Sequence, residues 1–168
     1  MIWSENGEIY LHDINAQTAS QATQLTTSAA IDTNPVISGT HVVFESDADG
    51  VGPQKPDLIR CDLTTVPPCL VKIQVTQSAA TQSNPSLDGT RLVWEDYDDG
   101  NGSESEPDIA TCDISLCATL CDPGVCPSAL KLTDDGAFQF NPQVSGNDVV
   151  WEDLRSGNYD IYSYTLST

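Results

Sequence analysis

The chain repeats one short pattern, and this repetition constrains its fold more than any other feature of the sequence. Each clear copy begins with Asn-Pro, passes through a Gly-containing turn to an aromatic residue and an acid, and reaches a short run led by aspartate. The clear copies are NPVISGTHVVFES (Asn34–Ser46), NPSLDGTRLVWED (Asn84–Asp96) and NPQVSGNDVVWED (Asn141–Asp153). A weaker copy, Ile2-Trp3-Ser4-Glu5, opens the chain. Self-similarity of this kind indicates a repeat architecture.

The spacing of the copies indicates which architecture to expect. The aromatic residue recurs at Trp3, Phe44, Trp94 and Trp151, which are about 41, 50 and 57 residues apart. Periods of roughly 40–50 residues with several strands per copy are typical of propeller blades. The apolar runs are short, rich in Val and Ile, and bounded by Gly, Pro, Asn and Asp, which favours strands over helices. We therefore predict an all-β chain that forms a β-propeller of about four blades, each an antiparallel four-stranded sheet.

The repeat is out of phase with the ends of the chain. A chain of 168 residues is normally one domain, so we expect a single propeller domain or propeller segment. Its repeats span approximately residues 1–33, 34–83, 84–140 and 141–168. By this division the first blade lacks its innermost strand and the last lacks its outermost strand. The chain is then a window on a longer propeller, a small ring with irregular closure, or a subunit completed by neighbouring copies.

The last copy carries a resemblance to a known family. Its pattern, N-P-x-x-S-G-x-x-V-V-W-E-D-x-R-x-G-x-x-D-I-Y, covers Asn141–Tyr162 and resembles the repeats of TolB-like, WD40-like bacterial and archaeal β-propellers. The second and third copies match in their first two strands but replace the short D-x-R-x-G link with longer acidic loops. The resemblance implies a propeller fold and a role as a binding or assembly platform rather than a particular activity.

The charge of the chain excludes several classes of partner. There are 25 Asp and Glu against 6 Lys and Arg, which gives a formal net charge of −19. Nucleic-acid binding depends on neutralising phosphates with Lys and Arg, so we expect no nucleic-acid partner. Anionic membrane surfaces are disfavoured for the same reason, and no run of about 18 apolar residues predicts membrane insertion. The charge favours cations, basic partners or a high-salt medium, or it serves only to keep the surface soluble.

Six cysteines report on the compartment. Aligned on the repeat, Cys61 and Cys69 occupy the same two positions as Cys112 and Cys126, on either side of a turn between neighbouring strands, where a disulfide can cross. Cys117 and Cys121 remain and would pair with each other. Of the 15 possible connectivities, the repeat thus selects 61–69, 112–126 and 117–121. The cysteine spacings fit a metal site poorly, so we predict disulfides and an oxidising, extracellular location.

Acidic loops follow the second strands and are a candidate cation site. Carboxylates that cluster on Gly-containing turns are the oxygen ligands that Ca²⁺ prefers, and like charges held close together are costly without a cation. The alternative is a solvated hairpin tip, because the complete EF-hand pattern is absent. The candidate calcium ligands are Asp47, Asp49, Asp57, Asp96, Asp98 and Asp108. One of these loops also carries a glycosylation sequon at Asn101.

We find no signature of an enzyme. No G-x-S-x-G elbow, H-E-x-x-H or Walker loop occurs. His12 stands where later copies have a cysteine, so it is expected to be structural, whereas His41 begins a second strand and is expected to be a surface variant. The pairs Glu95/Asp96 and Glu152/Asp153 match the two carboxylates of a glycosidase in residue type, but adjacent strand residues point to opposite faces, and the pairs recur with the repeat. We therefore predict no catalytic residues.

Three functions fit the sequence. The first is a non-catalytic extracellular structural or assembly protein, such as a fibre or surface-layer subunit whose copies are joined by strand exchange, because unpaired strand edges template strand addition. The second is a secreted propeller module that binds a protein, a glycan or a cation. The third is the propeller part of a larger secreted enzyme. The first predicts self-association as a homo-oligomer or filament, with no cofactor apart from possible Ca²⁺ in the acidic loops.

Overall fold

The computed structural model describes residues 1–14, 22–48, 55–98, 104–116 and 129–167. Within these ranges the chain is all-β: its strands form four antiparallel sheets, and no helix occurs. Accordingly, the described residues contain no helix that could span a membrane. The all-β prediction is therefore confirmed, as is the division into several antiparallel sheets.

Each sheet comes from one copy of the repeat, with its strands in chain order from one edge to the other. The first sheet comprises β1 (Ile2–Glu5), β2 (Glu8–Leu11) and β3 (Thr23–Gln24), and the second comprises β4 (Asp32–Ser38), β5 (His41–Ser46), β6 (Asp57–Asp62) and β7 (Lys72–Gln74). The third comprises β8 (Gln82–Asp88), β9 (Arg91–Asp98), β10 (Glu104–Asp113) and β11 (Leu130–Lys131), and the fourth comprises β12 (Gln139–Ser145), β13 (Asp148–Asp153) and β14 (Asp160–Thr165). The three-stranded sheets thus stand first and last, as the phase of the repeat predicts.

Tight turns connect the first two strands of the second, third and fourth sheets. Their glycines, Gly39, Gly89 and Gly146, have φ angles of 58°, 59° and 57°. A residue with a Cβ is strained in this left-handed region, so glycine recurs at the position that reverses the chain.

The Asn-Pro step of each repeat forms a local irregularity in the first strand. Asn34, Asn84 and Asn141 have φ angles of 46°, 52° and 51°, a region that asparagine tolerates better than most residues. The register of each first strand shifts at this point, for example between Thr33 and Val36 in the pairing of β4 with β5. The shift frees the asparagine from the ladder, so that its polar groups are available to other partners.

Hydrophobic clusters fill the three spaces between consecutive sheets, because strand residues alternate between the two faces. Between the first and second sheets the cluster is centred on Ile9, Leu25, Val42, Phe44, Cys61 and Cys69. Between the second and third it is centred on Val43, Leu58, Val75, Leu92, Trp94, Ala110, Cys112 and Ile114. Between the third and fourth it is centred on Val93, Ile109, Val149, Trp151 and Leu166. Each inner sheet therefore packs on both of its faces.

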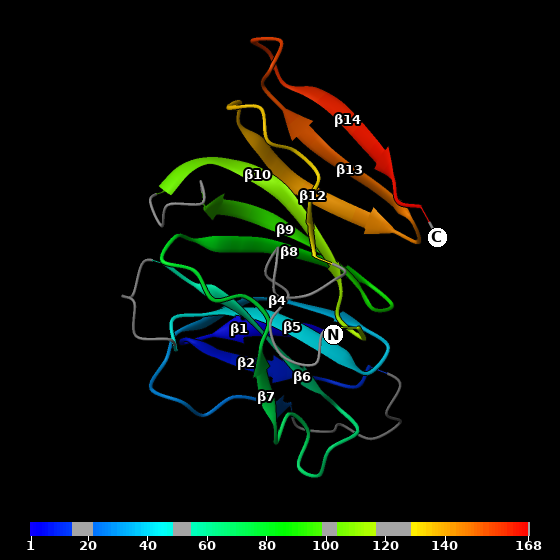
Figure 1. Ribbon diagram of the computed structural model, residues 1–168. Coiled ribbons are helices and arrows are strands. Elements are labelled where there is room, and N and C mark those ends of the chain that lie inside the picture. Colours follow the sequence, from blue (N-terminus) through cyan, green and yellow to red (C-terminus); the bar gives the residue numbers. More distant parts are fainter. Residues whose placement is uncertain (15–21, 49–54, 99–103, 117–128, 168) are drawn as a thin grey trace.

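The sheets follow one another in space in the order of the repeats. Strand β1 contacts β4, β4 contacts β8, and β8 contacts β12. Figure 1 shows the resulting stack, with the first and second sheets (blue and cyan) at one end and the fourth sheet (orange to red) at the other. No sheet in the described part of the chain closes on itself. The propeller arrangement of these sheets stays a prediction.

Candidate functional site

A polar arrangement recurs where the third strand of a repeat begins. The Thr76 hydroxyl donates to the Asp57 carboxylate at 2.8 Å and accepts the backbone N–H of Leu58 at 2.9 Å. Thr133 does the same with Asp108 and with the N–H of Ile109, at 3.0 and 2.8 Å. In the first sheet, Thr26 makes the equivalent contacts with Glu8 and Ile9. The acid that leads each of these strands thus fixes the threonine that follows the last strand of the same sheet.

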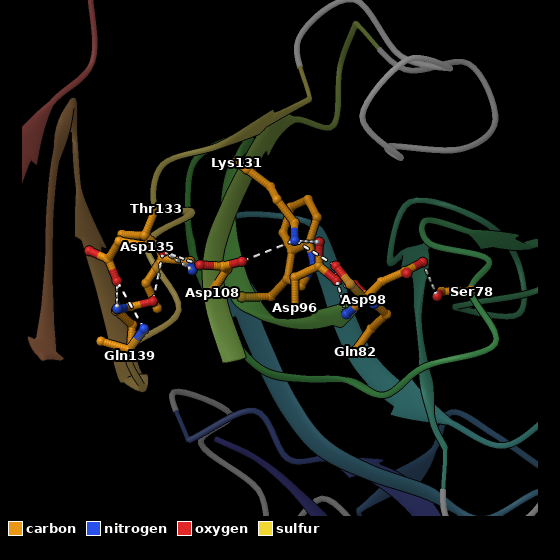
Figure 2. Close-up of polar contacts among 12 residues, drawn as sticks. Ser78, Gln82, Asp96, Asp98, Asp108, Lys131, Thr133, Asp135 and Gln139 are labelled. Atoms are coloured by element: carbon orange, nitrogen blue, oxygen red, sulfur yellow. Dashed lines mark hydrogen bonds and ion pairs between the residues drawn. The ribbon is translucent and has the colours of Figure 1, made fainter. Parts of the chain in front are cut away.

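Further carboxylates that the sequence suggests as calcium ligands accept hydrogen bonds in the third sheet. Asp96 Oδ1 accepts the Gln82 amide at 2.7 Å and the backbone N–H of Asp98 at 3.0 Å. The carboxylate of Asp98 accepts the Ser78 hydroxyl at 2.6 Å. Figure 2 shows these residues in one continuous polar network that also includes Asp108.

Lys131 contributes a positive charge to the centre of this network. Its Nζ atom lies 3.0 Å from Asp108 Oδ2 and 3.8 Å from Asp96 Oδ2 (Figure 2). Burial raises the pKa of Asp108, although the hydrogen bond from Lys131 opposes this change. Burial also disfavours the lysine ammonium, but the charge of Asp96 and the contacts with Asp108 outweigh it and raise the pKa of Lys131. The ammonium therefore stands between two carboxylates that were expected to bind a cation.

The remaining candidate calcium ligands are more scattered. Asp47 Oδ1 accepts the backbone N–H of Ile31 at 2.7 Å. Asp49 lies outside the described residues. Among the residues that are described, no group of three or more His, Cys, Asp or Glu side chains is arranged to hold a metal ion. Calcium binding by the acidic loops stays a prediction.

One predicted disulfide can be seen directly. Cys61 and Cys69 are bonded across the turn that follows β6, with their Cα atoms 4.9 Å apart. Cys112 is buried in the cluster between the second and third sheets. The structure does not describe its expected partner Cys126, the other predicted pair of Cys117 and Cys121, or the sequon residue Asn101. Those three predictions therefore stay predictions.

The repeated glutamate of the second strand forms a latch between neighbouring sheets. Glu45 Oε1 accepts the side-chain amide of Asn34 in its own sheet at 2.9 Å and the backbone N–H of Asn84 in the next sheet at 2.7 Å. Glu95 Oε1 repeats both contacts, with the Asn84 amide at 2.8 Å and the Asn141 N–H at 2.8 Å. We call this arrangement the Glu–Asn latch. It accounts for the recurrence of both residues in the sequence.

Glu152 holds the same repeat position in the fourth sheet but differs in its surroundings. Among the described residues, no hydrogen bond joins the Glu152 carboxylate to a donor, and its side chain is half-buried. It lines an open recess of about 400 Å³. The other residues that line the recess are Asn84, Glu95, Phe140, Asn141 and Tyr159. Two carboxylates, two amides and two aromatic rings thus border one open space at the Asn-Pro end of the third and fourth sheets.

The acids next to the latch glutamates point into different environments. Asp96 is linked through Gln82 to the indole of Trp94, whose Nε1–H donates to Gln82 Oε1 at 2.7 Å. In the fourth sheet, Asp153 accepts the indole N–H of Trp151 at 3.0 Å and is held by Arg155. The adjacent acids therefore do not form a facing pair, as the alternation of strand side chains predicts.

A variation in the second sheet leaves one buried acid incompletely bonded. Phe44 replaces the tryptophan there, and Asp32 and Ser46 stand where Gln82 and Asp96 do in the third sheet. Asp32 Oδ1 accepts the Ser46 hydroxyl at 2.6 Å, whereas its Oδ2 atom is buried without a hydrogen-bond partner in the described structure. Burial raises the pKa of Asp32, so the neutral form of this carboxyl is favoured relative to an exposed one.

The two histidines make local contacts, His41 at the start of β5 and His12 just after the end of β2. His41 Nδ1 is 3.4 Å from Asp62 Oδ2, and the backbone N–H of His12 donates to the carbonyl of Met1 at 2.9 Å.

The roles of Lys131 and of the Glu–Asn latch were not predicted from the sequence, although the histidines and the acid pairs were singled out. The regular spacing of the asparagines and glutamates was the available signal for the latch, because the partners come from consecutive repeats.

The sequence matches no protein-family model, and no curated protein matches it.

Proposed function

We propose that this chain is a segment of a β-propeller with a non-catalytic structural or assembly role outside the cell. The observation that carries the proposal is the Glu–Asn latch, because it assigns the repeated acids to contacts between sheets. Glu45 and Glu95 are each only 6% exposed, and each accepts a donor from the following sheet. Side chains committed to such contacts are poorly placed to bind or transform a substrate.

The propeller arrangement is supported by the way the sheets pack. Each sheet is an antiparallel meander, and consecutive sheets bury apolar faces against each other in chain order. Blades of a propeller have this topology and this mode of packing. The resemblance of the last copy to TolB-like, WD40-like repeats agrees with the arrangement but adds no activity.

An extracellular location is supported by the Cys61–Cys69 bond. Structural disulfides persist in oxidising compartments and are rare in the reducing cytoplasm of mesophiles. The formal net charge of −19 would keep such a protein soluble and free of nucleic acid. The proposal therefore places the chain at a cell surface or in the surrounding medium, where it associates with further copies of itself.

The recess beside Glu152 favours a second candidate function. The carboxylate of Glu152 and the ring of Tyr159, which is 66% exposed, offer the groups that bind a cation or a glycan. A secreted binding module would use this recess or the acidic loops, with Ca²⁺ as the metal best suited to clustered carboxylates. Isothermal titration with CaCl₂ and with simple oligosaccharides tests this alternative, and Glu152→Gln is the variant that should abolish binding in the recess.

Size-exclusion chromatography with multi-angle light scattering tests the structural proposal. The purified chain should gain mass as its concentration is raised, and electron micrographs should show discrete oligomers or filaments. A chain that stays monomeric over the whole accessible concentration range would refute the assembly role.

A further inference from the structure

The two end sheets of the stack each expose a face that the inner sheets keep covered. On the fourth sheet, Val150 pairs with Ser163 and Glu152 pairs with Ile161, so these four side chains share the face turned away from the third sheet. We call them the trailing face. On the first sheet, Trp3 pairs with Tyr10 on the side turned away from Ile9 and the second sheet. We call Trp3 and Tyr10 the leading face.

The trailing face consists of residues that are buried wherever another sheet follows. Val150 is 39% exposed, whereas its counterparts Val43 and Val93 are 0% exposed. Ile161 is 73% exposed, whereas its counterparts Leu58 and Ile109 are 0% exposed. The fourth sheet thus carries the apolar pattern of a covered face with nothing covering it in the described chain.

On the leading face, Trp3 has counterparts that are buried wherever another sheet precedes: Phe44, Trp94 and Trp151 are 1%, 0% and 5% exposed. The rings of Trp3 and Tyr10 are stacked with their centroids 5.7 Å apart. The equivalent pair in the fourth sheet, Trp151 and Tyr162, is stacked in the same manner at 6.3 Å. Trp151 is only 5% exposed, because it packs into the cluster formed with the third sheet, whereas Trp3 is half-buried.

These two faces are the two halves of an interface that the molecule already contains. Between the third and fourth sheets, Val93 and Ile109 pack with Trp151 and Tyr162. Val150 and Ile161 reproduce the first half of this contact, and the leading face reproduces the second half. Figure 1 shows the first and second sheets at one end of the stack and the fourth sheet at the other, and the exposure of Ile161 and the half-burial of Trp3 leave both halves uncovered in one copy.

We propose that the trailing face of one copy packs on the leading face of a second copy, so that the stack of sheets continues from one molecule into the next. The proposal rests on the assembly function proposed above and specifies its contact surface. The two surfaces differ, so the contact is head-to-tail and leaves a free face at each end of a dimer. Such a contact is open-ended and extends to longer oligomers unless the rotation closes a ring.

Variants that carry a charge on one of the two faces test the contact, and we call them capped variants. Ile161→Asp places a charge on the trailing face, and Trp3→Glu places one on the leading face, so neither variant should self-associate. Each should raise the dissociation constant by about tenfold or more, because charged groups are poorly tolerated in the core of an interface. A 1:1 mixture of the two retains one intact pair of faces and should form a heterodimer that grows no further.

Controls separate a lost contact from a lost fold. Val71→Asp changes an apolar residue that is 55% exposed just before β7, away from both faces, and should leave self-association unchanged. Circular dichroism melting of every variant verifies folding. Val150→Asp and Tyr10→Glu form a second pair if either first variant does not fold.

The possible outcomes decide between different contacts. Association of Trp3→Glu with itself, together with its loss in Ile161→Asp, would mean that trailing faces pair with each other and would overturn the proposal. Association that persists in both capped variants, as strand exchange through sheet edges would give, would also overturn it while sustaining the assembly function. An unmodified chain that never associates would overturn both.

Discussion

Removal of the Glu95 carboxylate tests the Glu–Asn latch. Glu95→Ala takes away the acceptor of the Asn141 backbone N–H, which comes from the next sheet, and of the Asn84 amide. The Asn84 amide keeps a second acceptor, Asn141 Oδ1, at 2.9 Å. The main loss of stability therefore comes from one backbone N–H, that of Asn141, which loses its charged acceptor at the junction of the third and fourth sheets.

The magnitude follows from the contacts. A hydrogen bond to a charged group contributes about 1.5–3 kcal/mol, and water can replace part of it because Asn141 is exposed. We expect Glu95→Ala to lower the free energy of unfolding by about 2 kcal/mol. For a chain of this size, about 2–4 °C of melting temperature corresponds to each kcal/mol, so the melting temperature should fall by about 4–8 °C.

The repeat supplies a matched control. Glu152→Ala removes the same residue from the same position of the fourth sheet, where the described structure shows no donor to it. Its effect should stay within about 0.5 kcal/mol, as is usual for substitutions that break no buried contact. Urea unfolding followed by tryptophan fluorescence measures both variants. Equal losses in the two variants, or no loss in Glu95→Ala, would refute the latch.

Further predictions concern pH, the disulfide and the cation. The hydrogen bonds from Arg155 hold the pKa of Asp153 at about 2, below its ordinary 3.8, so stability from this pair is present above about pH 4 and lost as the pH falls toward 2. The loss amounts to about 2 kcal/mol, and Asp153→Asn should abolish that part of the pH dependence of the melting temperature; an unchanged acid limb in the variant would count against the pair. The double variant Cys61→Ser/Cys69→Ser should lose about 2–3 kcal/mol, since the bond closes a short loop with a sequence separation of 8. Under reducing conditions the parent chain should fall to the same stability, and a reduced parent that matches the oxidised one would contradict this. If the acidic loops bind calcium, EDTA should lower the melting temperature and Ca²⁺ should restore it, whereas a melting temperature indifferent to both would leave the loop carboxylates as hydrogen-bond acceptors only.

Local patterns predicted much of the secondary structure. Glycines that permit positive φ, short Val- and Ile-rich runs and the aligned copies led to the strands, the turns and the Cys61–Cys69 bond. The three-stranded sheets at both ends of the stack also followed, because the phase of the repeat against the chain ends is visible in the sequence. These features depend on residues close together in the chain or on comparison of one copy with another.

Contacts between residues far apart in the chain were harder to foresee. Glu95 is 46 residues from the asparagine whose N–H it accepts, and only the packing of consecutive sheets brings the two together. Lys131 was not singled out at all, yet its ammonium lies between Asp108 and Asp96, which sequence reasoning assigned to calcium. A cluster of acids in a sequence does not reveal which protein donors or cations already satisfy it.

A reconstruction of the self-associated 168-residue chain by cryo-electron microscopy tests the central claim most directly. Because each copy carries a net charge of −19, the sample should be prepared at high ionic strength, where repulsion between copies is screened. We predict that the fourth sheet of one copy covers the first sheet of the next, with Ile161 and Val150 packed against Trp3 and Tyr10. Copies joined only through strand edges, or a sample that contains monomers alone, would contradict the account.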